Sequence, residues 1–244
     1  ADVLTGNNVL NLVQDLGDFA TAVDHLLAPD GLLVLEMLYF VDSIDHTAFD
    51  NVFHQNTTYW TLTALERFFR AHGLFVNDVE RISAFGGSLR AYMGRNEAPS
   101  ERVQALLAEE TRRGVDRYGF YAQFAQKVAA VKERILALIG ELRAQNRRIV
   151  AYGAAGGMAT TLLAYLGLDA RTLDYALDIN PHKHGRITAG SRLVVHPPEK
   201  LLEDQPDCVL LLAWNYADSV MAQLADYRGS GGRILVPLPK PRLI

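Results

Sequence analysis

Short apolar runs of strand length alternate with helical patterns at both ends of this 244-residue chain, and few folds accommodate that alternation. In each case a strand-like segment, a segment with apolar residues at helical spacing and a second apolar run follow one another. Strand, helix and strand in this order form the unit of a parallel sheet covered by helices, so the sequence predicts an α/β fold. The ranges are 2–4, 9–27 and 32–35 for the first unit and 207–215, 217–227 and 233–237 for the second.

A third unit of this kind precedes the second one. Residues 148–152 predict a strand, 153–157 a glycine loop, 158–166 a helix, and 175–177 a strand that ends at Asp178. No comparable unit precedes the first one. We therefore expect the first sheet to be half of a doubly wound sheet, without the half that carries the glycine-rich loop.

The middle of the chain predicts a helical connector. Apolar residues step by three or four from 120 to 142, the pattern of one long amphipathic helix. Before it, residues 86–93 predict a strand that is entered through glycines and closes the first sheet. The predicted domains are a partial α/β domain, a connector and a second α/β domain, at 1–95, 96–146 and 147–244.

The composition narrows the function classes. The 24 Lys and Arg are outnumbered by 28 Asp and Glu, so we expect no nucleic-acid partner. The single cysteine, Cys208, lies in an apolar run, which excludes a disulfide scaffold and a thiolate zinc site; we predict no metal and a reducing, cytoplasmic setting. We expect no membrane span, since no run approaches ~18 apolar residues. The first residue is Ala1, and we expect a processed or partial chain.

The glycine loop and Asp178 have the layout of a nucleotide-binding crevice. Glycines admit a phosphate to the backbone, and an acid after the second strand can bind ribose hydroxyls. The spacing of Gly153, Gly156 and Gly157 is not that of the dinucleotide fingerprint, and a tight strand-to-helix turn explains it as well. Asp178 has an alternative role as a cap of the Asn180 turn.

A basic cluster follows at the same end of the sheet: His182, Lys183, His184 and Arg186. One hypothesis is a clamp for a diphosphate or another anion. The alternative is a solvated turn, and both stay open.

Residues 53–60 form the densest polar and aromatic stretch of the chain, and such a stretch can line a pocket for a planar or sugar-like ligand. His54 is a candidate general acid or base, because the ordinary pKa of histidine lies near neutrality. The alternative is a structural histidine. Asp50, four residues earlier, is the nearest carboxylate.

Several short motifs carry a family resemblance when they are taken in order. The first block holds Asn7-Asn8-Val9, Pro29-Asp30-Gly31 with Glu36 and Tyr39, Phe49-Asp50 and Gly86-Gly87-Ser88-Leu89-Arg90. The second holds Tyr152-Gly153-Ala154-Ala155, Asp178 to Arg186, Pro197-Pro198-Glu199, Ala213-Trp214-Asn215 and Val236-Pro237. The ordered set resembles the S-adenosylmethionine-dependent C-methyltransferases that modify nucleotide-linked keto-deoxysugars for antibiotics and related natural products.

The resemblance implies a partial Rossmann-like methyltransferase sheet over 1–95, the helical connector, and a C-terminal Rossmann-like domain that helps to hold the nucleotide sugar. The family's N-terminal zinc domain and most of its S-adenosylmethionine site have no counterpart in these residues. By resemblance, Asn8 and Glu36 bind cofactor. The implied catalytic residues are His54, Gln55 and Asn56, and the implied substrate-binding residues are Tyr59, Ser88, Arg90, Gly153, Asp178, Lys183, Arg186, Trp214 and Asn215.

The sequence departs from the family at its reactive segment. The family pattern Tyr-His-Glu-His, with the second histidine as the expected base beside the sugar ketone, is Phe53, His54, Gln55 and Asn56 here. Three of these side chains cannot exchange a proton at neutral pH. A family histidine is replaced by Phe85, and the lysine after the Ala-Ala pair is lost to the 156–157 glycines.

Two predictions about function follow. The first is C-methylation of a keto-deoxysugar or related ketone in natural-product biosynthesis. The alternative is a repurposed homologue without methyl transfer, either a cyclase, isomerase or dehydratase that uses His54 with the Gln55 and Asn56 amides, or a non-catalytic domain of a polyketide-type synthase. The expected ligand is a nucleotide-linked sugar or a carrier-bound polyketide, and the expected protein partner is an N-terminal segment or a second copy.

Overall fold

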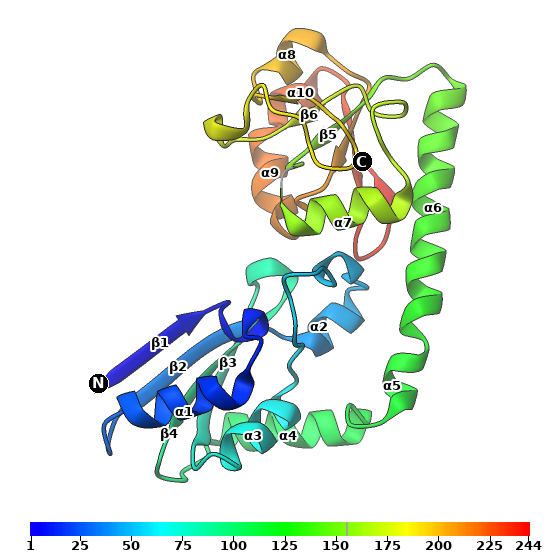
Figure 1. Ribbon diagram of the computed structural model, residues 1–244. Coiled ribbons are helices and arrows are strands. Elements are labelled where there is room, and N and C mark those ends of the chain that lie inside the picture. Colours follow the sequence, from blue (N-terminus) through cyan, green and yellow to red (C-terminus); the bar gives the residue numbers. More distant parts are fainter. Residues whose placement is uncertain (155) are drawn as a thin grey trace. The chain divides into compact units, whose positions relative to one another are not determined.

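The computed structural model describes residues 1–154 and 156–244 and divides into two compact units (Figure 1). Unit 1 contains residues 1–45 and 54–125. Unit 2 contains residues 46–53 and 126–244. The α/β class and the strand–helix–strand units are confirmed.

Unit 1 is built on a four-stranded mixed sheet of order β1-β2-β4-β3. β1 (Val3–Asn7) and β2 (Leu32–Leu38) are parallel, as predicted, whereas β4 (Ser88–Gly94) is antiparallel to both β2 and β3 (Phe75–Ile82). The prediction that the strand at 86–93 closes the sheet is wrong. It lies inside the sheet, and β3, where polar and apolar residues mix as an edge strand allows, is the outer strand.

The predicted helix at 9–27 is two elements. The short 3-10 helix η1 (Leu10–Leu12) ends before Asp15, whose carboxylate accepts from Asp18 N and begins α1 (Leu16–Leu26). A cap therefore interrupts a pattern that the apolar spacing alone would continue. The other helices of unit 1 are α2 (Phe40–Asp45), α3 (Leu62–Arg70), the 3-10 helix η3 (Ala84–Gly86), α4 (Glu101–Arg113) and α5 (Tyr118–Ala122).

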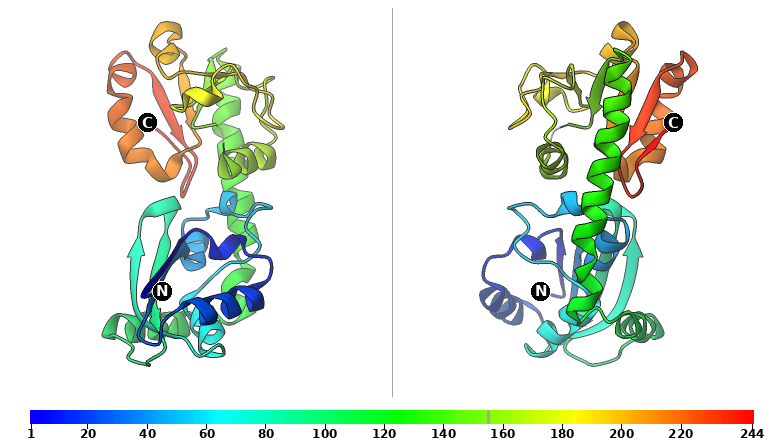
Figure 2. Two further views of the ribbon diagram at one scale, coloured as in Figure 1. Left: turned by 60° about the vertical axis from the view of Figure 1, so that its left-hand side comes forward. Right: turned by 90° about the vertical axis from the view of Figure 1, so that its right-hand side faces the viewer.

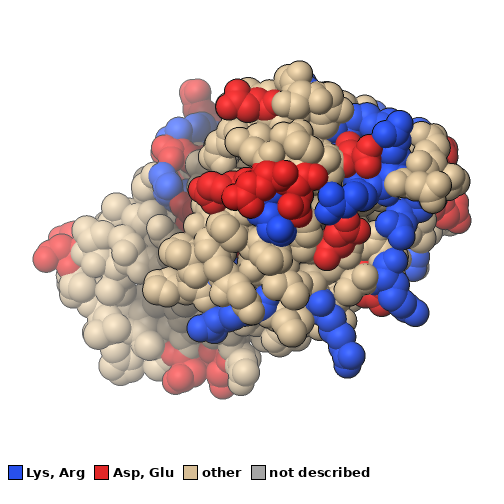
Figure 3. All heavy atoms as spheres, turned by 90° about the horizontal axis from the view of Figure 1, so that it is seen from above, with Lys and Arg blue, Asp and Glu red and all other residues tan. Residues whose placement is uncertain are grey.

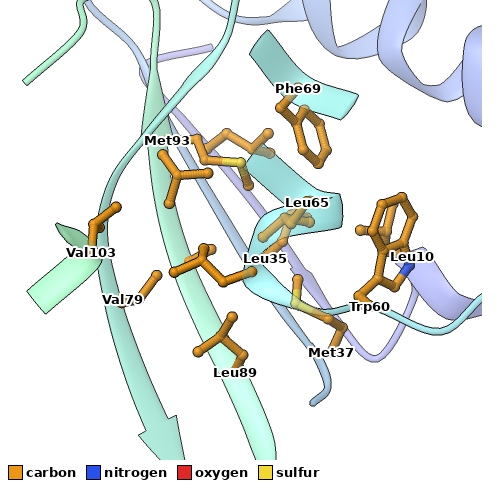
Figure 4. Close-up of a cluster of buried hydrophobic side chains, with 14 of the residues drawn as sticks. Leu10, Leu35, Met37, Trp60, Leu65, Phe69, Val79, Leu89, Met93 and Val103 are labelled. Carbon is orange, nitrogen blue, oxygen red and sulfur yellow. The ribbon is translucent and has the colours of Figure 1, made fainter. Parts of the chain in front are cut away.

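The core of unit 1 joins the sheet to α3 and α4 (Figure 4). Leu35 and Leu89 from the sheet meet Leu65 and Phe69 from α3, and Val103 adds the apolar side of α4. All are nearly or fully inaccessible to water. Each large apolar side chain of this kind contributes roughly 1.5–3 kcal/mol relative to exposure, so the core holds the strand ends that carry the polar residues in place.

Unit 2 is built on a six-stranded sheet of order β10-β9-β8-β5-β6-β7. All neighbours are parallel except β9 and β10. The chain leaves β5 in one direction for β6 and β7 and returns on its other side to β8, so the order reverses beside β5. The carboxyl ends beside such a reversal are where α/β sheets bind ligands. The strands are β5 (Ile149–Tyr152), β6 (Ala176–Leu177), β7 (Val195–His196), β8 (Cys208–Leu211), β9 (Arg233–Val236) and β10 (Arg242–Leu243).

The helices of unit 2 begin with α6 (Phe124–Ala144), the long helix seen in both views of Figure 2. The predicted helix over 120–142 is interrupted at Gln123, between α5 and α6. α7 (Gly157–Leu166) lies on one face of the sheet, and α9 (Ala217–Gln223) and α10 (Ala225–Gly229) lie on the other (Figure 2). The remaining elements are η2 (Phe49–Asn51), η4 (Pro181–Lys183), α8 (Lys200–Asp204) and η5 (Trp214–Tyr216).

The contacts group the chain differently from the three segments 1–95, 96–146 and 147–244, which stay a prediction. α4 packs on β3, so the first part of the predicted connector belongs to unit 1, while most of α6 belongs to unit 2. Residues 46–53 belong to unit 2 because η2 packs on α7.

Charged side chains of both signs stand side by side on the face seen in Figure 3. In unit 2 many of them are paired: Arg147 with Asp207 at 2.7 Å, and Arg148 with Asp174 at 2.9 Å. Within the described residues, no helix has the length and apolarity to cross a membrane. Nor do residues 1–154 and 156–244 hold three His, Cys, Asp or Glu side chains placed to bind a metal ion.

Candidate functional site

The glycine loop after β5 is shaped by protein packing. Gly153 has φ of +79°, and a Cβ there would lie 2.7 Å from the Cβ of Ala213. A Cβ at Gly157 would lie 2.6 Å from Cε2 of the Phe53 ring. Both positions therefore require glycine whether or not a phosphate binds. The Ala155 of the family motif lies outside the described residues.

Asp178 and the basic cluster meet at the carboxyl end of β6. The Asp178 side chain, 6% exposed, accepts from Lys183 Nζ at 3.0 Å and from the backbone N–H of Asn180 at 2.9 Å. The His184 ring Nε2 lies 2.7 Å from the Asp178 carbonyl oxygen. The predicted cap of the Asn180 turn is thus an observed contact. Arg186 is exposed.

Asp50 is buried completely beside the loop that follows β8. Its Oδ2 accepts from Trp214 Nε1 at 2.7 Å, and its Oδ1 has no hydrogen-bond partner within residues 1–154 and 156–244. Burial raises the pKa of Asp50 to about 6, although the Trp214 hydrogen bond opposes that shift. In the same segment the Phe49 ring lies 4.8 Å from the Tyr165 ring of α7. Asn215, next to Trp214, is half-buried.

The reactive segment of unit 1 begins with two exposed side chains, His54 and Gln55. Asn56, in contrast, is 8% exposed, and its Oδ1 accepts from Asn11 Nδ2 at 2.7 Å. The Tyr59 ring stands 4.9 Å from the Phe40 ring. The predicted catalytic residues thus differ in burial: His54 and Gln55 are exposed, and Asn56 is buried.

The predicted cofactor residues lie at the carboxyl ends of β1 and β2. Asn8 adopts a left-handed φ of 53°, which asparagine tolerates, and its N–H donates to the Glu36 carbonyl at 2.7 Å. Its buried Oδ1 is without a partner in the part of the chain that is described. The Glu36 carboxylate accepts from Arg90 Nη2 at 2.9 Å and raises the pKa of that arginine. Glu36 and Arg90 are cross-strand neighbours, so their ion pair stabilises the pairing of β2 with β4.

Ser88 is fully buried and donates to the Ala84 carbonyl at 3.0 Å. This bond closes the turn of η3, where Phe85 has φ of 54°. Gly87 has φ of 137°, and a Cβ there would overlap the Cβ of Asp42. The glycines before β4 are therefore explained by the backbone conformation and by the proximity of Asp42.

Sequence reasoning gave no role to Glu110 of α4, which is fully buried. Its carboxylate accepts from Tyr39 Oη at 2.6 Å, from the N–H groups of Leu62 and Thr63 at 2.7 Å each, and from Thr63 Oγ1 at 2.6 Å. It therefore caps the start of α3. Burial, and then this carboxylate, raises the pKa of Tyr39 well above its ordinary range.

Comparison with known proteins identifies the family. Residues 83–239 match the family model described as the C-methyltransferase C-terminal domain. Over 247 aligned positions the chain is 33% identical to C-methyltransferase NovU of Streptomyces niveus, covering all of this chain and 59% of that protein. The chain belongs to the C-methyltransferase family. It spans about three fifths of the length of this relative.

Membership in the C-methyltransferase family confirms the resemblance inferred from the ordered motifs. The matched region begins just before β4 and includes Gly153, Asp178, Lys183 and Trp214. His54, Gln55 and Asn56 precede it and fall within the alignment to NovU. The roles assigned to all these residues remain predictions. No functional role was predicted for Asp50 or Asn11. An acid between the apolar residues Phe49 and Val52 is nevertheless a pattern that indicates a buried carboxylate.

Proposed function

We propose that this chain is part of an S-adenosylmethionine-dependent C-methyltransferase that acts on a nucleotide-linked keto-deoxysugar, or a related ketone, in natural-product biosynthesis. The observation that carries the proposal is the similarity of the whole chain to a protein named as a C-methyltransferase, together with the family match. The substrate, the cofactor and the catalytic activity are parts of the proposal.

The residues of unit 1 fit one part of such a cofactor. Asn8 offers a buried acceptor oxygen, with no partner among the described residues, at the carboxyl end of a parallel strand. Asn8 would hold a donor group of S-adenosylmethionine there, whereas the Glu36 carboxylate is already paired with Arg90. When bound, the cofactor supplies an electrophilic methyl group. The amino acids of this chain must then prepare the carbon that receives it.

In this proposal His54 takes the proton from the carbon beside the ketone. Its side chain is exposed to solvent. The amide groups of Gln55 and Asn56 donate to the oxygen that becomes negative when the proton leaves. Asn56 thereby stabilises charge at the position where the family places a base.

Unit 2 would hold the nucleotide. The buried Asp178 fits a ribose hydroxyl, and Lys183, 3.0 Å from that carboxylate, carries the positive charge that a diphosphate requires. Arg186 is exposed and can add a second charge, while Trp214 and Asn215 lie at the carboxyl end of β8. Because Phe53 packs against Gly157, we assign the diphosphate to these basic side chains and not to the start of α7.

The alternative function is that of a repurposed homologue without methyl transfer, such as a cyclase, isomerase or dehydratase, or a non-catalytic domain of a polyketide-type synthase. One observation favours it. The Tyr-His-Glu-His segment of the family is Phe53, His54, Gln55 and Asn56 here, so a base and an acid have become amides.

Calorimetry of the protein with S-adenosylmethionine and with a thymidine diphosphate-linked ketosugar tests the proposal. We expect the sugar nucleotide to bind, and His54→Ala to abolish turnover while binding persists. Uptake of neither ligand by the folded protein would contradict sugar methylation. Unchanged turnover in His54→Ala would remove His54 from the mechanism.

A further inference from the structure

A cavity of about 210 Å³ lies within unit 2, between α8 and the α9–α10 segment. Its lining comes from three places in the chain: the carboxyl ends of β5 and β6, the start of α8, and the end of α9 with α10. Its volume is below the roughly 300 Å³ at which pockets for whole drug-sized ligands begin. The cavity therefore fits one ring of a larger ligand.

The cavity adjoins the carboxyl end of β6, where Asp178 lies. Ile179, which lines it, directly follows Asp178 in the chain. Tyr152, which also lines it, is paired in the parallel sheet with Leu177, the residue before Asp178. Burial, and then the carboxylates of Asp178 and Glu199, raise the pKa of Tyr152 above its ordinary value. A nucleotide whose sugar reaches Asp178 can therefore extend a further ring into this cavity.

The cavity has an apolar interior and an acidic margin. Leu201 and Leu224 line it and are buried. The charged side chains in its described lining, Glu199 and Asp226, are both acids and both exposed. Like charges repel, so such a margin disfavours a phosphate group. The lining is suited to a neutral ring with an apolar edge.

Two apolar side chains of the lining are exposed to water, Ile179 at 70% and Leu202 at 49%. A single exposed apolar residue needs no explanation, but two on one cavity offer surface that a planar ring would remove from water. Gln223 adds a direction. Its Oε1 accepts from the Tyr152 hydroxyl at 3.3 Å, so Nε2 is the end of this amide that can donate to a ring carbonyl.

We propose that this cavity binds the base of the sugar nucleotide, and that the base is a pyrimidine with a 5-methyl group, as in thymine; the inference rests on the proposed function. Ile179 and Leu202 lie against the ring, and Gln223 Nε2 donates to one of its carbonyl groups. The methyl group enters the apolar space beside Leu201 and Leu224. The acidic margin directs the diphosphate away from the cavity, toward the basic cluster that follows β6.

Calorimetry with thymidine diphosphate and with 2′-deoxyuridine diphosphate, which lacks only the methyl group, tests this assignment. We expect the wild-type protein to bind thymidine diphosphate about fourfold more tightly, because one methyl group is buried. Ile179→Ser should weaken the binding of both diphosphates roughly tenfold, since apolar surface against the ring is lost. Gln223→Leu should weaken the binding of both about fivefold through loss of one hydrogen bond, and the preference for the methyl group should remain.

Ile187→Ser is the matched control. Ile187 is 65% exposed and belongs to unit 2, but it does not line the cavity. We expect this variant to keep the wild-type affinity for both diphosphates. Because Ile179, Ile187 and Gln223 are all exposed, thermal unfolding of the three variants should match that of the wild-type protein.

Wild-type affinities in Ile179→Ser, or equal affinity of the wild-type protein for the two diphosphates, would overturn the base pocket and leave nucleotide binding intact. An equal loss in Ile187→Ser would overturn it as well, because the effect would then belong to the surface of unit 2 in general. If the wild-type protein binds neither diphosphate, the nucleotide-binding part of the proposed function fails, and this pocket fails with it.

Discussion

Replacement of Asp50 by asparagine should change the stability of unit 2, relative to the parent protein, more favourably at pH 8 than at pH 5. The folded-state pKa of Asp50, about 6, lies above its ordinary value of 3.8 because the carboxyl group is buried. Between these values the folded chain holds a proton that the unfolded chain has released. The stability that this group contributes is therefore complete below pH 4 and is lost as the pH rises to about 6.

The magnitude follows from the shift. About two pKa units correspond to roughly 3 kcal/mol over the whole range, and roughly 1–2 kcal/mol of this falls between pH 5 and pH 8. Asparagine keeps an oxygen for the Trp214 N–H and does not ionise. Its amide group changes the free energy of unfolding by an amount independent of pH, so only the difference between the two pH values is interpreted.

The chain contains two tryptophans, Trp60 in unit 1 and Trp214 in unit 2. In a Trp60→Phe background, Trp214 fluorescence during urea unfolding reports on unit 2. The free energy of unfolding of unit 2 is compared between Asp50→Asn and its parent. We expect this difference to change by roughly 1–2 kcal/mol in favour of the variant from pH 5 to pH 8.

Asp207→Asn is the matched control in the same unit. The backbone N–H of Arg148 and the side chain of Arg147 lower the pKa of Asp207, so its titration is complete below pH 5. Its effect on stability should be equal at the two pH values. An Asp50→Asn effect that is also equal at pH 5 and pH 8 would refute the assignment of a buried, protonated carboxyl group.

Three further outcomes are expected. Glu110→Gln should cost unit 1 about 3 kcal/mol or more in urea unfolding, since an amide N–H would face buried donors; a loss below 1 kcal/mol would contradict the cap. Gly157→Ala should destabilise unit 2 by about 1–3 kcal/mol through contact with the Phe53 ring, and thermal unfolding without a shift would disprove that contact. Lys183→Ala should weaken thymidine diphosphate binding about tenfold in calorimetry, whereas indifference would favour a solvated turn.

The strands that were predicted from the sequence are those in which consecutive residues are apolar and buried. β2, β5, β8 and β9 lie in parallel pairings and read as apolar runs. β6, predicted at 175–177, is also present. β3 was missed because an edge strand needs fewer apolar residues, and β7 was missed because it is only two residues long. The position of β4 inside the sheet depends on antiparallel pairing, which no local pattern records.

The same limit applies to the site. Asp178 and Lys183 stand five residues apart on one turn, so their proximity could be predicted. Asp50 and Trp214 are separated by 164 positions, and Asn11 and Asn56 by 45. Such contacts depend on the tertiary fold, and each involves a polar group that hydropathy alone would place at the surface.

Phe53 and Gly157 lie against each other in unit 2. Both positions belong to segments in which the resemblance inferred from the motifs predicts other residues, a tyrosine at 53 and a lysine at the 156–157 glycines. The ring of Phe53 occupies the space that a side chain at 157 would need, with Cε2 2.6 Å from the position of a Cβ. A lysine at 157 would therefore displace the ring. Because the two side chains would share this space, Phe53→Tyr with Gly157→Lys together should destabilise unit 2 less than the sum of the two single changes.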